Sequence, residues 1–212
     1  MRVLLTKIVL TACVLFSASF PAGAKVALQK KRTTRHARRP QKPLREPDVI
    51  FVPTPPETVD EMLRQARLKK GDVLFDLGSG DGRIPIAAAK QYGVRAVGID
   101  IDPKLVDEAT ENAKREGVGN LVTFRLGDMF AADLRGATVV TLYLSDTLNV
   151  LLRPKLLREL PVGARIVSHD FRMGDWQPET SVRVPWKNLY RTVYVWTVPR
   201  GRRYKKGSVS RL

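Results

Sequence analysis

Cysteine and histidine are scarce in this chain. Its 212 residues include a single cysteine, Cys13, and two histidines, His36 and His169. The sequence after Ala24 contains no cysteine at all. If the chain is cleaved there, the remaining domain has no disulfide, no cysteine nucleophile and no thiolate metal ligand. The two histidines are far apart in the sequence and form no ligand motif, so we expect no metal site.

A long hydrophobic run is also missing. The apolar run from Ile8 to Phe20 has 13 residues, whereas a membrane-spanning helix needs about 20. Arg2 and Lys7 precede it and Ala22-Gly23-Ala24 follows it, which is the layout of a signal peptide. Basic residues follow directly, and positive charge at that place disfavours translocation. We therefore expect residues 1–24 to be a signal peptide or a short membrane anchor, with the protein exported or membrane-associated and the side of the membrane left open.

Acidic residues are nearly absent from two segments. Residues 25–48 carry nine basic residues against two acidic ones, and residues 200–212 carry six against none. Residues 49–199 are close to neutral, with 20 basic and 19 acidic residues, so the net charge of +16 belongs mainly to the ends of the chain. Both basic segments are poor in apolar residues, which predicts a disordered linker and a disordered tail. They could contact an anionic membrane surface or nucleic acid, while residues 49–199 can form one globular domain.

Short apolar runs alternate along this domain with segments of helical periodicity. Strands are predicted near residues 72–77, 95–100, 121–126, 137–144, 164–169, 181–184 and 190–198. Helices are predicted from residue 55 to about 67 and near 83–91, 103–116 and 146–159. This alternation predicts an α/β domain of three layers with a largely parallel sheet. The link between the last two strands is too short for a crossover, so they should form an antiparallel hairpin.

The loop after the first predicted strand is rich in glycine. In Asp76-Leu77-Gly78-Ser79-Gly80-Asp81-Gly82-Arg83, three glycines stand at alternate positions in front of a helix. Glycine permits positive φ and lets a ligand lie against bare backbone at a helix N-terminus. The dinucleotide fingerprint has a different spacing, and the carboxylate of Asp76 would repel a pyrophosphate but attract an ammonium group. S-adenosylmethionine has an ammonium group and no phosphate, so we predict that it is bound by Asp76, Gly78, Gly80, Asp81 and Gly82.

Two further acids follow predicted strands. Asp100 ends the second strand at the place where a strand–helix–strand unit positions a ribose-binding carboxylate. Asp128 lies in the loop after the third strand, where it could accept a hydrogen bond from the adenine amine or be a solvent-exposed turn residue. Asp102 precedes Pro103, which favours a helix N-cap over a ligand role. Asp100 and Asp128 complete the predicted cofactor site.

These motifs together resemble class I S-adenosylmethionine-dependent methyltransferases, and the resemblance covers roughly residues 48–199. Further segments are similar to the protein-lysine methyltransferases that modify the adenine nucleotide translocase and the ATP synthase c subunit, and to their bacterial relatives. The segments are Phe51-Val52-Pro53-Thr54-Pro55, Val167-Ser168-His169-Asp170-Phe171 and Asp175-Trp176-Gln177-Pro178. The resemblance implies a Rossmann-like fold with a seven-stranded sheet. It also implies methyl transfer by in-line displacement to a deprotonated lysine amine of a protein, which could be a membrane protein.

Residues at the ends of the fourth and fifth strands are candidates for the acceptor site. Tyr143 could line a channel for a lysine stem or be a core tyrosine with its hydroxyl at the rim. His169 could act as a catalytic residue, although a histidine in a strand is more often a packing residue. The resemblance places Pro53 and Thr54 over the methionine end of the cofactor, and Trp176 could cover the crevice or fix its own loop.

The acceptor remains open at this point. No Asn-Pro-Pro-Tyr or Asp-Pro-Pro-Tyr tetrapeptide is present, which disfavours methylation of planar amides or adenine amines. Alternatives to a protein lysine are RNA, a small molecule, or binding of the cofactor without catalysis.

Overall fold

The computed structural model describes residues 46–201. The predicted leader or anchor at residues 1–24 lies outside the described residues, as do most of the basic segments 25–48 and 200–212. Within residues 46–201, no helix is long and apolar enough to cross a membrane.

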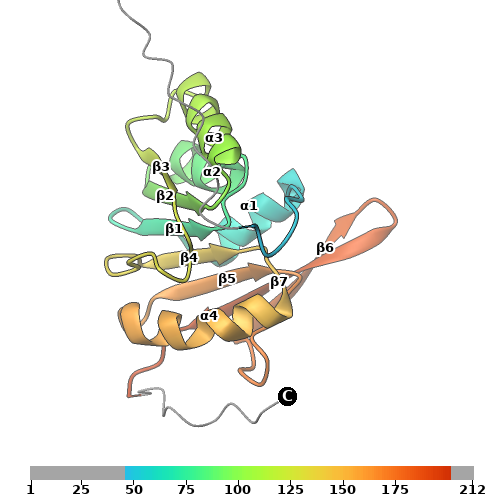
Figure 1. The fold of residues 1–212 in the computed structure, drawn as a ribbon. Helices are drawn as coiled ribbons and strands as arrows, with labels where there is room; N and C mark the ends of the chain where they lie inside the picture. Colours follow the sequence, from blue (N-terminus) through green and yellow to red (C-terminus); the bar gives the residue numbers. More distant parts are fainter. Residues whose placement is uncertain (1–45, 202–212) are drawn as a thin grey trace, which may run out of the picture. The chain divides into compact units, whose positions relative to one another are not determined.

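Seven strands form one sheet in the order β3-β2-β1-β4-β5-β7-β6 (Figure 1). The strands are β1 (Val73–Leu77), β2 (Arg95–Asp100), β3 (Val122–Leu126), β4 (Val139–Leu142), β5 (Arg165–His169), β6 (Thr180–Trp186) and β7 (Leu189–Thr197). The first five are parallel to one another, whereas β7 is antiparallel to both β5 and β6. The structure thus confirms the predicted α/β fold, with its mostly parallel sheet and C-terminal hairpin.

Helices cover both faces of the sheet, as a three-layer domain requires. The helices are α1 (Pro56–Gln65), α2 (Arg83–Tyr92), α3 (Pro103–Arg115) and α4 (Asp146–Glu159). Buried side chains of α1, α2 and α3 share one hydrophobic core with Leu74 and Val139, and leucines of α4 share another with Phe75 and Val140. Successive strand residues point to opposite faces. The apolar runs of β1 and β4 therefore serve both cores.

Helix starts follow the local sequence chemistry. Pro56 is the first residue of α1, where a missing N–H costs nothing. Asp102 caps α3 by accepting a hydrogen bond from the backbone N–H of Lys104, as predicted. The side chain of Ser145 caps α4 in the same way, accepting from the N–H of Leu148. These two caps each follow a parallel strand, so the polar groups of their loops gather at the carboxyl edge of the sheet.

The opposite edge of the sheet is held by a buried ion pair. Asp72, which is 4% exposed, accepts hydrogen bonds from the Arg165 guanidinium (2.5 Å) and the Thr138 hydroxyl (2.7 Å). Arg165 also donates to the backbone carbonyls of Ala66 and Arg67, just after α1. Burial acts to raise the pKa of Asp72, but these bonds and one from the backbone of Lys69 outweigh it and lower the pKa below its usual value. This cluster joins α1, β1 and β5.

Replacing Arg165 with methionine should therefore destabilise the domain. The change leaves the Asp72 carboxylate buried without its cation and should lower the free energy of unfolding by about 3 kcal/mol. Urea denaturation followed by circular dichroism measures the loss. Arg135→Met is the matched control, because Arg135 pairs with Asp133 on the exposed surface and its loss should change stability little. A loss for Arg165→Met no larger than the control would contradict the assignment.

Candidate active site

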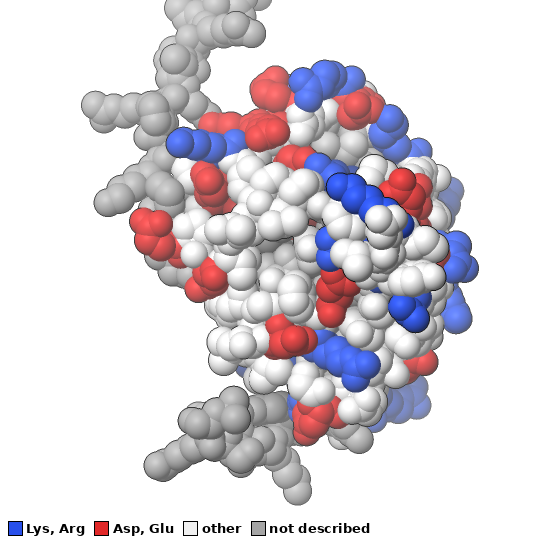
Figure 2. Space-filling model, turned by 90° about the vertical axis from the view of Figure 1, so that its right-hand side faces the viewer, with Lys and Arg blue, Asp and Glu red and all other residues white. Residues whose placement is uncertain are grey.

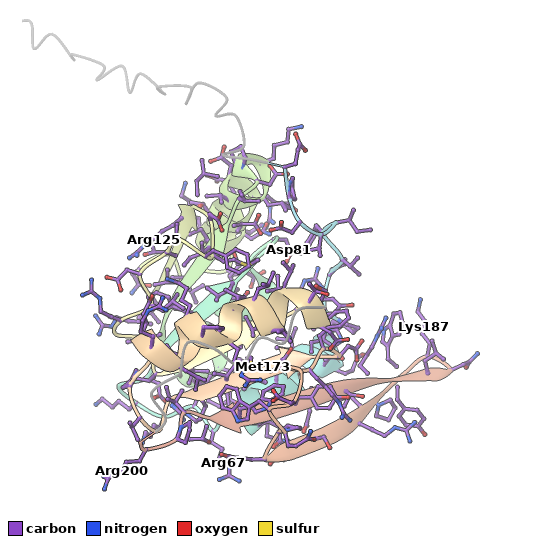
Figure 3. The ribbon with its side chains drawn as sticks, turned by 60° about the horizontal axis from the view of Figure 1, so that its bottom comes forward. Arg67, Asp81, Arg125, Met173, Lys187 and Arg200 are labelled. Atoms are coloured by element: carbon purple, nitrogen blue, oxygen red, sulfur yellow. The ribbon has the colours of Figure 1, made fainter. Side chains whose placement is uncertain are left out.

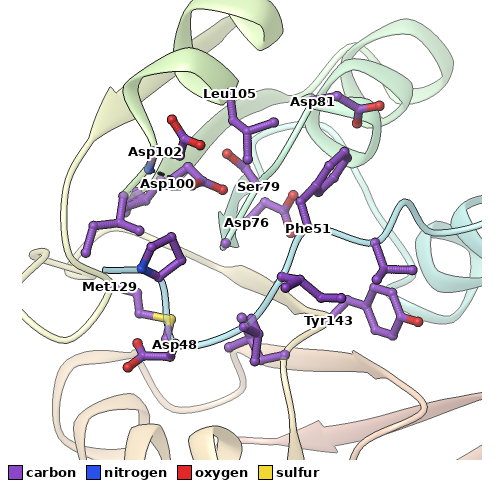
Figure 4. Close-up of a pocket in the computed structure, with 18 of the residues that line it drawn as sticks. Asp48, Phe51, Asp76, Ser79, Asp81, Asp100, Asp102, Leu105, Met129 and Tyr143 are labelled. Atoms are coloured by element: carbon purple, nitrogen blue, oxygen red, sulfur yellow. Dashed lines mark hydrogen bonds between the residues drawn. The ribbon is translucent and has the colours of Figure 1, made fainter. Parts of the chain in front are cut away.

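A pocket of about 500 Å³ opens at the carboxyl edge of the parallel strands (Figure 4). Its lining comes from the glycine loop, from the ends of β2, β3 and β4, and from the segment that precedes α1. The lining includes five predicted cofactor residues, namely Asp76, Gly78, Asp81, Asp100 and Asp128. Figure 2 faces this edge and shows carboxylates distributed around largely uncharged surface. Parallel α/β sheets typically bind their ligands at this position.

The glycine loop needs its glycines for two reasons. Gly78, Gly80 and Gly82 all have positive φ, at 75°, 52° and 81°. A Cβ atom on Gly82 would lie 2.4 Å from the ring of Phe124, so any side chain there would collide with β3. Gly80 and Gly82 do not line the pocket themselves. Their backbone geometry instead brings Gly78, Ser79 and Asp81 to its wall.

The Asp100 carboxylate joins two of the pocket's loops. One oxygen accepts a hydrogen bond from the backbone N–H of Gly80 (2.8 Å) and the other from that of Asp102 (3.0 Å). Asp100 is 8% exposed and lies on the pocket wall. Asp102 lines the pocket as well as capping α3, a position that the sequence interpretation had not given it. Asp128 faces the same pocket and accepts from the N–H of Phe130 (2.9 Å).

Asp76 is a buried acid of the pocket with a raised pKa. It is 3% exposed at the end of β1, and its carboxylate accepts a hydrogen bond from the Thr141 hydroxyl (2.7 Å). Burial raises the pKa of Asp76 to about 7, the Thr141 bond opposes the change, and the carboxylates of Asp100 and Asp81 add to it. No cation of the chain is paired with this carboxylate among the described residues. A ligand with an ammonium group would supply the missing charge.

Arg83 fastens the segment before α1 to the glycine loop. Its guanidinium donates to both carboxylate oxygens of Asp81, and its Nη1 donates to the backbone carbonyl of Thr54 (2.7 Å). Upstream of Thr54, residues 46–52 form one wall of the pocket, and the Phe51 ring lies against Gly80. The sequence indicated Phe51 and Val52 only as part of a family-like segment and predicted none of residues 46–52 as a pocket wall. The signal available was the run Val49-Ile50-Phe51-Val52, which is apolar yet belongs to neither a helix nor a strand.

Tyr143 and His169 lie together, with Thr54 beside them. The Tyr143 and His169 rings stack with centroids 3.8 Å apart, and Phe171 lies 5.8 Å from Tyr143 on centroids. The Thr54 hydroxyl is 3.2 Å from Nδ1 of His169. Tyr143, just after β4, lines the pocket, whereas His169 is completely buried behind it. The sequence-predicted acceptor residues thus form one cluster, with Tyr143 in front.

The charge state of this cluster follows from its burial. Burial lowers the pKa of His169, partly offset by Asp170, so the imidazole is neutral near pH 7. Its Nε2 lies 3.4 Å from an oxygen of Asp170 and makes no hydrogen bond to any described residue. Burial raises the pKa of Tyr143, so its hydroxyl stays protonated. The cluster therefore presents a neutral, aromatic wall to the pocket.

Two other predicted residues lie outside the pocket lining. Pro53 is exposed, next to the pocket-lining residues 46–52 and Thr54. Trp176 packs against Trp196, and its backbone carbonyl accepts a hydrogen bond from the indole N–H of Trp196 (2.8 Å). These contacts fix the loop after β5. For Trp176, these contacts match the role of fixing its own loop and not that of covering the crevice.

Comparison with known proteins places the chain that forms this pocket in a family. Residues 76–180 match the family described as ANTKMT methyltransferase domain. A protein-lysine N-methyltransferase of Saccharolobus islandicus is 40% identical over 153 residues, which are 72% of this chain and 95% of that protein. The chain belongs to this methyltransferase family. The adenine nucleotide translocase lysine N-methyltransferase of Mus musculus is 40% identical over 131 residues, or 61% of this chain and 56% of that protein.

A solved structure agrees with the family assignment and identifies the cofactor. The crystal structure of an RNA methyltransferase from Salinibacter ruber in complex with S-adenosyl-L-homocysteine is 54% identical, with a TM-score of 0.67. The match covers 70% of this chain and 95% of that one. The present protein is an S-adenosylmethionine-dependent methyltransferase.

The pocket of the methyltransferase fits this cofactor. Asp76 offers a buried carboxylate to an ammonium group, and the Ser79 hydroxyl has no hydrogen-bond partner among residues 46–201. The pocket's arginine, Arg83, is already engaged by Asp81 and Thr54, as suits a ligand without phosphate. Ile101, Leu105 and Met129 add apolar surface for a planar base. In the described part of the chain, no group of three or more His, Cys, Asp or Glu side chains could hold a metal ion.

The raised pKa of Asp76 makes cofactor binding and stability depend on pH in opposite directions. The native pKa lies above the unfolded one, so the stabilising contribution of Asp76 is full below pH 4 and is lost as the pH rises through about 7. Asp76→Asn should therefore raise the melting temperature of the cofactor-free methyltransferase at pH 8, with a gap that closes toward pH 4. Differential scanning calorimetry from pH 4 to pH 8 measures this difference in melting temperature between the two proteins.

The affinity for S-adenosylmethionine should change with pH in the direction opposite to that of stability. A bound ammonium group favours the ionised carboxylate, so the affinity of the wild-type protein for S-adenosylmethionine should increase from pH 6 to pH 8. The Asp76→Asn variant should bind more weakly at pH 8 and lack this increase. Isothermal titration calorimetry at three pH values gives the change of affinity with pH, that is the slope, for each of the two proteins. Equal slopes in the two proteins would remove Asp76 as the partner of the ammonium group.

Proposed function

We propose that this methyltransferase methylates lysine side chains of a protein substrate. The observation that carries the proposal is the neutral aromatic wall of Tyr143 and buried His169 at the cofactor pocket. Such a wall suits the long apolar stem of lysine better than a charged or bulky acceptor. The 40% identical relative from Saccharolobus islandicus, a protein-lysine N-methyltransferase matched over nearly its full length, supports the same acceptor.

The cofactor's orientation in the pocket is part of the proposal. We infer that Asp76 pairs with the ammonium group, that Asp100 accepts from the ribose hydroxyls and that Asp128 accepts from the adenine amine. Asp100 is suited to this because each of its oxygens accepts one backbone N–H and retains a second lone pair. Ile101, Leu105 and Met129 belong to the same pocket lining as Asp128 and would hold the base. The methyl end then lies toward Tyr143 and Thr54.

The chain's own contribution to the reaction is positioning and desolvation. The bound cofactor supplies an activated methyl group on its sulfonium, and in-line transfer needs a neutral amine held in front of it. Exposed apolar residues at the rim, Phe51 and Val52, would lower the pKa of an incoming lysine by desolvation. The oxygen of the Tyr143 hydroxyl, which stays protonated at neutral pH, can accept a hydrogen bond from an N–H of the amine and so leave the amine's lone pair free to face the methyl group. His169 supports Tyr143 by stacking.

RNA is the second candidate acceptor. The 54% identical protein from Salinibacter ruber is named an RNA methyltransferase. The two acceptors give opposite results in a single experiment.

A labelling experiment decides between them. The full chain is incubated with S-adenosylmethionine carrying a labelled methyl group and with protein and RNA fractions of the source cells. We expect label in protein that survives ribonuclease and is lost when the lysines are first blocked by reductive methylation. Asp76→Ala is the inactive control. Label that appears only in RNA and disappears with ribonuclease would overturn the lysine proposal.

Tyr143 should affect turnover more than cofactor binding. Tyr143→Phe keeps the ring on His169 and should retain cofactor affinity within about twofold, with a modest fall in kcat. Tyr143→Ala removes the wall and should lower kcat/KM for the acceptor at least about tenfold, or about 1.4 kcal/mol. Steady-state kinetics and cofactor titration separate the two effects. If Tyr143→Ala weakened cofactor binding as much as turnover, the residue would belong to the cofactor site instead.

A further inference from the structure

The β6–β7 hairpin extends past the core sheet beside the active site. In the pairing of β5 with β7, His169 lies opposite Val193, so β7 residues 189–192 continue beyond the end of β5. Their partners on β6 run from Arg183 to Trp186. Four residues of strand span about 13 Å, and Figure 1 shows the hairpin projecting from the sheet in the direction in which β5 points. The tip therefore flanks the edge at which the pocket opens.

The hairpin carries charge of one sign. Residues 180–197 contain Arg183, Lys187 and Arg191 and no acidic residue. Exposed apolar surface accompanies the charge, because Leu189 is 63% exposed and Tyr190 is 55% exposed. Figure 3 places Lys187 at the far end of the hairpin. We call Arg183, Trp186, Lys187, Leu189 and Tyr190 the hairpin tip.

The cations of the tip are held in place by aromatic rings. The guanidinium of Arg183 lies 4.0 Å from the centroid of the Tyr190 ring, and the ammonium of Lys187 lies 4.7 Å from that of Trp186. Neither cation forms an ion pair with any of residues 46–201. A preorganised guanidinium binds carboxylates with little further loss of entropy. The tip is thus suited to an anionic partner with some apolar surface.

The rings themselves favour a protein over RNA as this partner. Base stacking needs a free aromatic face. At the tip, Arg183 already lies over one face of the Tyr190 ring, and Lys187 and Arg191 both lie over the Trp186 ring, so fewer faces remain for bases. Exposed Leu189 adds a contact for an apolar side chain. Carboxylates of a polypeptide, with an apolar residue among them, match this surface.

The tip is connected firmly to the acceptor wall. Asp170 donates its backbone N–H to the carbonyl of Thr192, and its carboxylate accepts from the N–H of Thr192 and from Arg191. Asp170 directly follows His169, which stacks on Tyr143. A segment bound at the tip would therefore lie at a defined distance from an amine held at Tyr143.

We propose that the hairpin tip docks an acidic stretch of the protein substrate that lies near the lysine to be methylated. The proposal rests on the lysine-methylating function proposed above. It deepens that function by naming the substrate class, namely lysines flanked by Asp and Glu.

Matched peptides and charge reversals test the proposal. One peptide carries a lysine flanked by Asp and Glu, and a second has Asn and Gln in their place. We expect the wild-type protein to prefer the acidic peptide at least about tenfold in kcat/KM, with a preference that weakens as salt increases. Arg183→Glu/Lys187→Glu should reduce this preference at least about fivefold and leave cofactor affinity within about twofold.

The control variant carries the same charge change elsewhere. Lys70→Glu/Arg95→Glu alters two exposed residues at the opposite edge of the sheet and should keep the preference. Arg183→Gln/Lys187→Gln is a milder second variant, and circular dichroism verifies that each variant is folded. Equal preference in the wild-type and tip variants would overturn the docking proposal. The proposal would also be overturned if the tip variants lost binding to phosphatidylserine vesicles or to RNA while their peptide preference stayed unchanged.

A binding measurement keeps this test separate from the acceptor question. Fluorescence anisotropy with the acidic peptide, its lysine replaced by norleucine, reports docking without methyl transfer. Tip-dependent binding with no lysine methylation would sustain the docking surface and refute the lysine function. Lysine methylation without tip-dependent binding would support the lysine function and refute the docking surface.

Discussion

The Asp100 carboxylate is the contact on which the arrangement of the pocket depends. It lies at the end of β2, an interior strand, and accepts one backbone N–H from the glycine loop and one from the turn that starts α3. Both loops would otherwise present unpaired N–H groups in a nearly buried position, which costs free energy. With Asp100 in place, Gly80 and Asp102 are drawn together around one carboxylate. The residue proposed to bind the ribose is thus also the residue that shapes the cavity for it.

The acidic side of the pocket shows why binding and stability oppose each other here. Burial raises the pKa of Asp76, and the nearby carboxylates of Asp100 and Asp81 add to the increase. Arg83 donates its hydrogen bonds to Asp81 and to the Thr54 carbonyl. The cofactor-free protein therefore keeps a carboxyl group in an unfavourable place. A cationic ligand turns that unfavourable site into a source of affinity.

The sequence predicted the cofactor half of the site more completely than the acceptor half. Alternation of apolar runs and helical periods located all seven strands, and acids at strand ends are informative because parallel strands end at one edge. The place of the wall formed by residues 46–52 could not be predicted, since its apolar run has no periodicity and its position depends on the Arg83–Thr54 bond. For His169 the sequence favoured a packing role, but the residues that bury it were hidden. Its burial results from the packing of Tyr143 and Thr54 around the imidazole, contacts between residues far apart in the sequence.

Thr54 connects the two halves of the site. Its carbonyl accepts from Arg83, which belongs to the glycine loop, and its hydroxyl contacts His169, which supports the acceptor wall. Because Thr54 is 3% exposed and lies just before α1, a shift of either partner must move the start of that helix or break a buried contact. In-line transfer loses rate steeply when the acceptor is displaced by even about 1 Å. A single buried residue that contacts both halves keeps the cofactor loop and Tyr143 in register, so that the site depends on this short segment as much as on the sheet beneath it.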